Sequence, residues 1–187
     1  MHRFSPEHAG VLDSEWRRRV FPAEEVIEFA VREVPQRGTA VDVGAGTGYL
    51  TVPLARAFKK VYAIEISPKM AEKLEDRLRR EGITNVEVIV TEEPPDVGEF
   101  DLAVFSSVLH EMERPGEYLR WAGKAFVLVA EWKKEPMPFG PPVEERLSPE
   151  DIVRLAENFE PVKYRELEYH YLMLLRPKVR GGRNGVL

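Results

Sequence analysis

The stretch Val41-Asp42-Val43-Gly44-Ala45-Gly46-Thr47-Gly48-Tyr49-Leu50 decides how this chain is interpreted. An apolar run ends at three glycines spaced two residues apart, and apolar residues at helical spacing follow. This order predicts a buried strand, a tight turn and a helix, the arrangement that places a nucleotide-like ligand at the carboxyl end of a parallel sheet. Glycine permits positive φ and close approach of a ligand to the backbone. The N–H groups at the start of the helix favour an anionic group, either a carboxylate or a phosphate.

The spacing of the glycines separates two classes of ligand. A dinucleotide fingerprint, G-x-G-x-x-G, would have its third glycine where Tyr49 stands. The chain instead has G-x-G-x-G, with Asp42 two residues before Gly44. This D-x-G-x-G-x-G pattern resembles motif I of the class I S-adenosylmethionine-dependent methyltransferases. The alternative for the glycines alone is a tight turn with no ligand.

A second acidic residue supports a nucleotide-type site. Val61-Tyr62-Ala63-Ile64 predicts the next buried strand, and Glu65 ends it 23 residues after Asp42. An acidic side chain at this place can accept hydrogen bonds from both ribose hydroxyls. The run Val61 to Glu65 is similar to the end of strand two in the methyltransferases. The alternative for Glu65 is a solvated carboxylate at a strand end.

Hydrophobic periodicity predicts the other elements of one α/β domain. Strands are expected over 86–90, 100–105, 125–130, 162–167 and 169–175, with helices starting near residues 22, 50, 68, 115 and 149. The resemblance implies a Rossmann-like, seven-stranded, mostly parallel sheet with an antiparallel last strand and helices on both faces. The expected division is an N-terminal arm or lid over 1–21, the methyltransferase domain over 22–176 and a flexible tail over 177–187.

The resemblance also implies which residues hold S-adenosylmethionine. The glycine loop, including Ala45 and Gly48, would hold the methionine part, with Asp42 near its ammonium group. Glu65 would hold the ribose, with Ile66 beside it. Residues just after the third and fourth strands complete the set: Glu92 for adenine, with Glu93 as a competitor, and Phe105 and Ser106 under the reactive end.

His110 is the candidate catalytic residue, because it is the one histidine of four that follows the fourth strand closely. An imidazole titrates near neutral pH and can act as a general base. The alternative is a polar residue packed at the start of a helix. The N-terminal arm carries Phe4 and Trp16, which would cover the cofactor if the arm were a lid, whereas the alternative is a partly ordered arm with a solvated basic face.

Composition restricts the partners of the chain. Its 187 residues include no Cys, which excludes a thiolate metal site, and His110-Glu111 alone supplies too few ligands for a divalent ion, so no metal is expected. The net charge of −5 provides no overall field for nucleic acid, and no apolar run is long enough to span a membrane. A cytoplasmic location is expected, and the sequence carries no signal for an oligomeric state.

The sequence at the end of the fourth strand indicates which class of methyl acceptor to expect. Enzymes that methylate amino groups of DNA carry a D/N-P-P-Y/F/W motif there, and this chain has Phe105-Ser106-Ser107-Val108. The resemblance therefore implies a methyltransferase that moves a methyl group in line to a small-molecule acceptor. Two alternatives stay open: a catalytically idle cofactor-binding or partner-binding module of the same fold, and a nicotinamide-dependent oxidoreductase.

Overall fold

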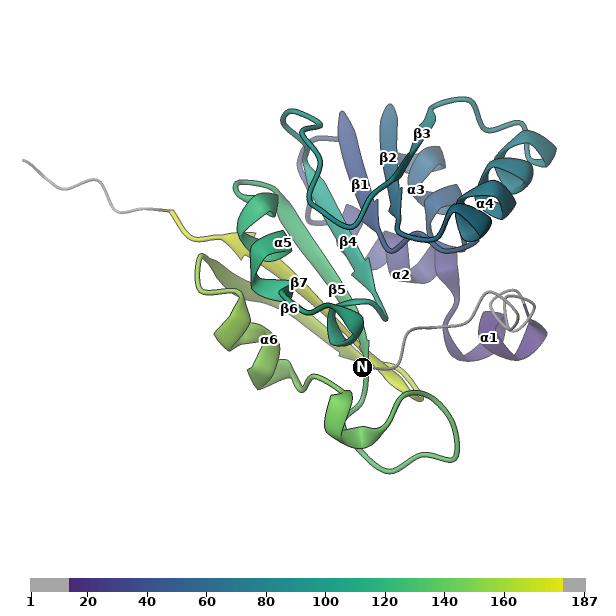
Figure 1. The fold of residues 1–187 in the computed structure, drawn as a ribbon. Helices are drawn as coiled ribbons and strands as arrows, with labels where there is room; N and C mark the ends of the chain where they lie inside the picture. The colour runs from purple at the N-terminus through teal and green to yellow at the C-terminus, as the bar shows by residue number, and fades with distance from the viewer. Residues whose placement is uncertain (1–13, 180–187) are drawn as a thin grey trace, which may run out of the picture.

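The strand that ends at the glycine loop, β1 (Thr39–Val43), lies inside a seven-stranded sheet, between β2 and β4 (Figure 1). The computed structural model describes residues 14–179. The strands lie side by side in the order β3-β2-β1-β4-β5-β7-β6. Their bounds are β2 Lys60–Glu65, β3 Val86–Val90, β4 Leu102–Ser106, β5 Phe126–Trp132, β6 Phe159–Glu166 and β7 His170–Pro177.

Strand direction confirms the predicted sheet. β1 pairs in parallel with β2 on one side and with β4 on the other, and β3 and β5 extend these pairs in parallel. The last strand, β7, inserts between β5 and β6 and is antiparallel to both. The sheet order therefore reverses between β1 and β4, and the carboxyl ends of these two strands flank the crevice where such sheets bind ligands.

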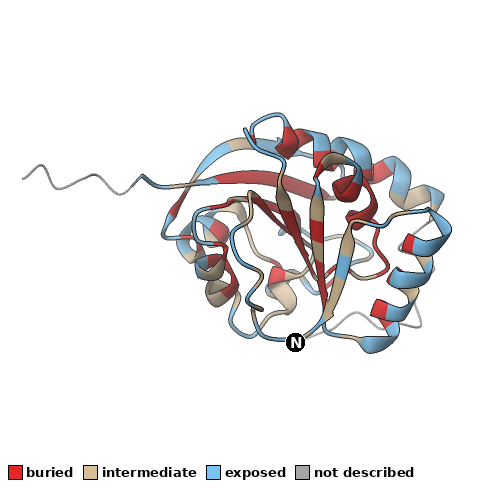
Figure 2. Cartoon of the chain, turned by 90° about the horizontal axis from the view of Figure 1, so that it is seen from above, coloured by how far each residue is buried: buried red, intermediate tan, exposed pale blue. Residues whose placement is uncertain are grey.

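Helices cover both faces, as the sequence predicts. Apolar residues of α2, α3 and α4 pack on one face of the sheet, and those of α5 and α6 pack on the other. Figure 2 shows that buried residues follow the central strands and the inner sides of these helices. The helix bounds are α1 Glu15–Val20, α2 Ala23–Val31, α3 Thr51–Ala57, α4 Pro68–Arg80, α5 Pro115–Ala122 and α6 Pro149–Leu155.

Local sequence explains where these helices start. Ser67 caps α4 by accepting a hydrogen bond from the Met70 N–H, and Pro68 occupies the first turn, where it displaces no hydrogen bond. Ser148 and Asp151 form a reciprocal capping box at α6. Pro53 falls in the first turn of α3, so the helix starts only at Thr51, after a series of turns, as its proline predicts.

Two segments of the chain lie outside the regular alternation of strands and helices. Residues 91–101 connect β3 to β4 without a helix, as the short spacing predicts. Residues 15–20 form α1, which Ser14 caps by accepting a hydrogen bond from the Arg17 N–H; they lack apolar periodicity, and only Val20 of α1 is buried. The predicted roles of Phe4 and of residues 180–187 lie outside the described residues.

Candidate functional site

The glycine loop adopts a conformation that requires its glycines. Gly44, Gly46 and Gly48 have φ values of 73°, 56° and 86°. A Cβ atom on Gly44 would lie 2.5 Å from Cγ2 of Val108, and one on Gly48 would lie 2.4 Å from Cδ1 of Leu74. The loop therefore turns sharply at the carboxyl end of β1 and packs directly against the segment after β4.

Glu65 joins the glycine loop to the next strand. Its side chain is buried, and its Oε2 accepts a hydrogen bond of 2.8 Å from the Gly46 N–H. Its Oε1 accepts a bond of 2.9 Å from the Ser67 N–H at the start of α4. An ionised carboxylate has about four lone-pair positions, so both oxygens keep capacity for a further donor.

Asp42 lies beneath the same loop. Its carboxylate is buried and accepts a hydrogen bond of 2.6 Å from Oγ1 of Thr51. Burial raises the pKa of Asp42 to about 6, and the negative charge of Glu65 adds to this, although the Thr51 hydrogen bond and the positive charge of Arg17 oppose it. The loop thus covers a carboxylate that a nearby cation would help to keep ionised.

The predicted adenine residues lie at the rim of the site. Glu93 is exposed and pairs with Arg114 at 3.3 Å. Glu92 is also exposed, and its backbone carbonyl accepts a hydrogen bond of 3.1 Å from the Tyr118 hydroxyl. Ile66, after β2, is 41% exposed, and Val90, at the end of β3, is 49% exposed, which leaves two apolar side chains at neighbouring strand ends open to solvent.

The end of β4 contains backbone strain. Ser107 has a φ of 51°, and it is the one residue other than glycine with a positive φ between residues 14 and 179. Its N–H donates to the Ala130 carbonyl of β5 at 2.8 Å. Phe105, just before it, is buried in edge contact with Tyr118. Such conformations persist where surrounding contacts hold them, and they occur often at functional sites.

Three buried polar atoms in the described part of the chain have no hydrogen-bond partner. They are Oγ1 of Thr47, Oγ of Ser106 and Nδ1 of His170. All three belong to residues at one edge of the sheet: the glycine loop, the carboxyl end of β4 and the start of β7. An unpartnered buried polar group is costly, so this edge of the sheet has the character of a binding site.

His110 contacts a carboxylate that the sequence analysis did not select. Nδ1 of His110 lies 2.8 Å from Oε2 of Glu131, and Oε1 of Glu131 accepts bonds from the Val108 and Leu109 N–H groups at 3.1 and 2.9 Å. Burial disfavours the protonated imidazole, but the hydrogen bond and charge of Glu131 outweigh burial and raise the pKa of His110. The sequence feature that could have identified Glu131 is an acidic residue at the last buried position of an otherwise apolar strand.

Aromatic rings gather around His170 at the same edge. The His170 ring lies 4.0 Å from Trp132 and 4.7 Å from Phe21, measured between centroids. Burial lowers the pKa of His170 to about 3, so this imidazole stays neutral. Trp16 of α1 packs edge-on against Phe139 at 5.0 Å. These contacts bring α1, β5 and β7 together, which no local sequence pattern indicates.

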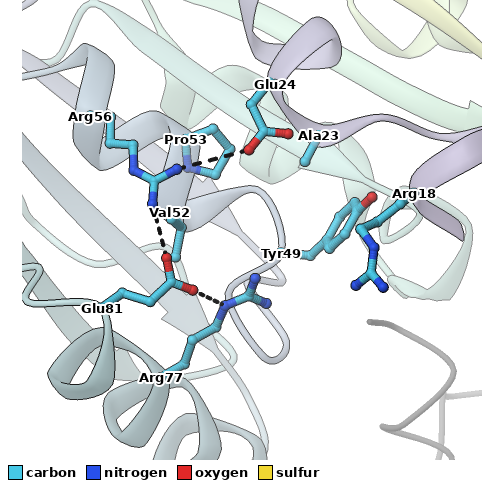
Figure 3. Close-up of a pocket in the computed structure, with 9 residues that line it drawn as sticks. All are labelled: Arg18, Ala23, Glu24, Tyr49, Val52, Pro53, Arg56, Arg77 and Glu81. Carbon is cyan, nitrogen blue, oxygen red and sulfur yellow. Dashed lines mark hydrogen bonds and ion pairs between the residues drawn. The ribbon is translucent and has the colours of Figure 1, made fainter. Parts of the chain in front are cut away.

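Two hollows are formed by residues other than the predicted cofactor residues. One, of about 100 Å³, lies where α2, α3 and α4 meet and contains an ion-pair network in which Arg56 lies 3.0 Å from Glu81 and Arg77 pairs with the same carboxylate (Figure 3). The other, of about 380 Å³, is formed by the loop 137–146. None of the predicted cofactor residues lines either hollow.

Between residues 14 and 179, no helix is long and apolar enough to cross a membrane, and no group of three or more His, Cys, Asp or Glu side chains could hold a metal ion.

Comparison with known proteins gives a consistent result. A family model described as "Methyltransferase domain" matches residues 41–126. The probable ribosomal RNA small subunit methyltransferase A of Pyrobaculum islandicum is 40% identical over 75 residues, which cover 40% of this chain and 30% of that protein. The protein-L-isoaspartate O-methyltransferase of Methanoculleus marisnigri is 30% identical over 86 residues, 44% of this chain and 39% of that protein. The chain thus matches less than half the length of either relative.

A solved structure resembles the whole domain. The crystal structure of a S-adenosylmethionine-dependent methyltransferase from Aquifex aeolicus superposes with a TM-score of 0.82 at 26% identity, covering 94% of this chain and 100% of that one. The matched family model and the fold are those of class I S-adenosylmethionine-dependent methyltransferases.

Proposed function

We propose that this chain binds S-adenosylmethionine and transfers its methyl group, in line, to a small-molecule acceptor. One observation carries the proposal. The glycine loop, with its three positive φ values, and Glu65 are joined by the Gly46 hydrogen bond at the β1 side of the point where the sheet order reverses. That junction offers backbone to a ligand on one side and a carboxylate with spare acceptor capacity on the other.

The residues around this junction fit the parts of the cofactor. The glycine loop from Gly44 to Gly48 would hold the methionine part, and the buried orphan hydroxyl of Thr47 supplies a further polar contact there. Asp42 would place negative charge near the ammonium group, and Glu65 would accept hydrogen bonds from the ribose hydroxyls. The exposed side chains of Ile66 and Val90 would contact the faces of the adenine.

The rim and the end of β4 complete the assignment. Glu92 or Glu93 would accept the adenine amino group, and Phe105 and Ser106 would lie beneath the reactive end. When bound, the sulfonium of the cofactor supplies an activated methyl group. The protein then has to align the acceptor with it and exclude water, because the sulfonium charge disperses during transfer.

The sequence at the end of β4 supports a small-molecule acceptor. Phe105-Ser106-Ser107-Val108 occupies the position of the amino-methylation motif, and the net charge of −5 gives no general attraction to nucleic acid. The relatives named for ribosomal RNA or protein substrates match only a part of their own length. RNA and protein acceptors therefore enter as comparison substrates in the test.

Calorimetric titration tests the cofactor assignment. We expect S-adenosylmethionine and S-adenosylhomocysteine to bind and NAD not to bind. Glu65→Ala should weaken binding by about 10- to 150-fold, the loss expected for hydrogen bonds to a charged group worth roughly 1.5–3 kcal/mol. Glu87→Ala, which removes an exposed carboxylate paired with Lys60, is the matched control and should bind as the wild type does.

The outcomes separate the alternatives. Micromolar binding of NAD without binding of the sulfonium cofactor would assign the chain to the nicotinamide class. Release of S-adenosylhomocysteine is then measured with a panel of small hydroxyl, amine and thiol compounds, total RNA and unfolded protein. Turnover with RNA or protein alone would replace the small-molecule acceptor, and cofactor binding with no turnover on any member would favour the idle module.

A further inference from the structure

The carboxylate of Glu131 is unusual because it is fully buried and has no lysine or arginine partner among residues 14–179. It is 0% exposed at the end of β5. Within the described residues, its one ion pair is with His110. A buried charge is costly unless hydrogen bonds satisfy it, and Glu131 receives three: two from backbone N–H groups and one from the imidazole.

This arrangement fixes where the proton of His110 resides. An ionised carboxylate only accepts hydrogen bonds, so the imidazole must donate to Glu131 from Nδ1. In the neutral ring Nε2 is then the unprotonated nitrogen. It lies on the opposite side of the ring from Glu131, and its distance of 3.8 Å from Oε1 of Glu111 is beyond hydrogen-bonding range. The geometry thus leaves a basic nitrogen facing away from β5.

The segment that carries His110 is held in place from two sides. Ser107 donates its N–H to Ala130 of β5 in a strained conformation. Val108, the next residue, packs so tightly on Gly44 that a Cβ there would meet it. His110 therefore follows directly on a segment clamped between the glycine loop and β5, beside the expected reactive end of the cofactor.

We propose that Glu131 is a positioning residue that makes His110 the general base for an acceptor hydroxyl group. This inference rests on the proposed function. In the step, the acceptor oxygen forms a bond to the methyl carbon as the bond from that carbon to sulfur breaks, which leaves S-adenosylhomocysteine. The hydroxyl proton passes to Nε2 of His110 and from there to solvent.

A hydroxyl acceptor gains more from a general base than an amine or a thiol does. A neutral amine already presents a lone pair, and a thiol with a pKa near about 8.5 ionises appreciably at neutral pH. A phenolic hydroxyl, with a pKa of about 10, keeps its proton and gains most from a positioned base. The rings of Trp132 and Phe139 lie at the same edge of the sheet and suit a flat acceptor that carries such a hydroxyl.

The charges around His110 set the expected pH dependence. Glu131 on β5, Glu111 beside it and Glu145 on the loop before α6 all favour the protonated imidazole. His170, at the start of β7 on the same edge of the sheet, is neutral because burial lowers its pKa. Since the pKa of His110 is raised, its basic form accumulates only above the ordinary range of histidine. Turnover should therefore rise with pH through that raised pKa.

Glu131→Gln separates the positioning of the His110 ring from the hydrogen bonds that Glu131 accepts from the Val108 and Leu109 N–H groups. The amide oxygen can still accept from the Val108 and Leu109 N–H groups and so keep the turn after β4. The amide NH₂ then faces Nδ1 of His110 and donates to it, which moves the ring proton to Nε2 and removes the base. Glu111→Gln is the matched control, since it also removes a nearby negative charge but leaves the Nδ1 contact intact.

The first readout needs neither cofactor nor acceptor. Long-range ¹H–¹⁵N spectra of ¹⁵N-histidine-labelled protein report which ring nitrogen carries the proton. We expect Nδ1–H for neutral His110 in the wild type and in Glu111→Gln, and Nε2–H in Glu131→Gln. An Nε2–H tautomer in the wild type, or no change in Glu131→Gln, would overturn the positioning role. Circular dichroism checks that both variants fold.

The second readout is methyl transfer to phenols, aliphatic alcohols, thiols and amines, followed across pH. A hydroxyl compound should be turned over, with kcat rising through the pKa of His110 measured by NMR. Glu131→Gln should lower kcat by about 10²- to 10⁴-fold with KM little changed, whereas Glu111→Gln should keep the plateau kcat of the wild type and reach it at a lower pH, because a charge that favours the protonated imidazole is removed. Transfer to thiols or amines alone, or equal kcat in Glu131→Gln, would contradict the inference.

The two proposals fail in different ways. A protein that does not bind S-adenosylmethionine in the calorimeter contradicts the proposed function, whatever the tautomer of His110. A protein that binds the cofactor but methylates no hydroxyl compound contradicts the hydroxyl assignment and leaves the cofactor assignment standing.

Discussion

At the scale of single residues, the Asp42 carboxylate proposed to bind the cofactor is also one whose burial lowers the stability of the protein. Its buried carboxylate has a pKa raised from 3.8 to about 6, chiefly by burial. Because the folded pKa exceeds the unfolded one, the folded state binds more protons between these two values, and stability falls as pH rises through that window. The shift corresponds to an upper limit on the order of 3 kcal/mol once the group is ionised in both states.

Asp42→Asn should remove this cost. We expect the variant to gain stability over the wild type as pH rises from about 4 to about 6 and to keep the gain at pH 7, because an amide oxygen can still accept from Thr51. Affinity for S-adenosylmethionine should fall at the same time. Urea denaturation across pH and calorimetry measure the two effects.

A surface substitution provides the comparison for Asp42→Asn. Asp76→Asn on α4 changes an exposed ion pair with Arg79 and should alter stability by less than about 0.5 kcal/mol. If the stability difference between Asp42→Asn and the wild type did not change between pH 4 and pH 6, burial of a charged Asp42 would not be the cause.

At the scale of elements, Arg146 organises the loop between β5 and α6. Its guanidinium is buried and donates hydrogen bonds to four backbone carbonyls, those of Lys133, Glu135, Phe139 and Pro141. These residues form no regular ladder, so the planar, five-donor side chain replaces one. The loop is thereby held against the Trp132 ring, whose centroid lies 6.0 Å from the guanidinium.

Arg146→Lys should destabilise the protein despite keeping the charge. A lysine ammonium cannot reach all four carbonyls, and each buried acceptor left unpaired costs roughly 1–3 kcal/mol. We expect a loss of more than about 2 kcal/mol in urea denaturation and faster proteolysis within residues 133–147.

The matched control for Arg146→Lys is Arg154→Lys, an exposed partner of Asp151 on α6. It should change stability by less than about 0.5 kcal/mol. Equal losses in the two variants would show that the carbonyl contacts of Arg146 do not hold the loop.

On the scale of the whole molecule, aromatic contacts join distant segments at the carboxyl edge of the sheet. Trp16 of α1 contacts Phe139 of the loop and Tyr169 between β6 and β7. Phe21 contacts His170, and the hydroxyl of Tyr49 donates to the Phe21 carbonyl at 2.8 Å. α1 is therefore attached to the same edge that carries the glycine loop (Figure 1).

The lid role of the N-terminal arm is a prediction that this attachment makes testable. If the arm closes over the cofactor, S-adenosylmethionine should slow amide hydrogen exchange in residues 14–21. Deletion of residues 1–15 should lower cofactor affinity or turnover with little loss of thermal stability. Unchanged exchange protection on addition of the ligand would exclude the lid, and a lower melting temperature with preserved affinity would favour a structural arm.

Transfer should proceed without a metal ion. The expected mechanism needs alignment and a base but no Lewis acid, and His110 and Glu111 alone would be too few ligands. EDTA should therefore leave the initial rate unchanged, measured by S-adenosylhomocysteine release before and after addition of Mg²⁺. A rate abolished by the chelator and restored by Mg²⁺ would contradict this.

The sequence by itself determined the parts of this protein that depend on local pattern. The run from Val41 to Leu50 specified strand, turn and helix, because glycines at that spacing allow the positive φ values that the turn requires. The alternation and length of apolar runs specified the strands, and the caps at Ser67 and Ser148 specified where helices start. The order of these elements predicted the edge where the ligand is expected, and the resemblance to the methyltransferases implied the seven-stranded sheet.

Only the tertiary structure decided which side chains meet at that edge. Glu131 and His110 are 21 residues apart and touch because β4 and β5 pair in parallel. His170 reaches Trp132 only because β7 inserts antiparallel beside β5. Such contacts follow from strand pairing between segments far apart in the chain, and a local pattern carries no information on which partners a buried carboxylate or imidazole will find. The sequence alone predicts where the site lies, and the fold brings His110 and Glu131 together beside it.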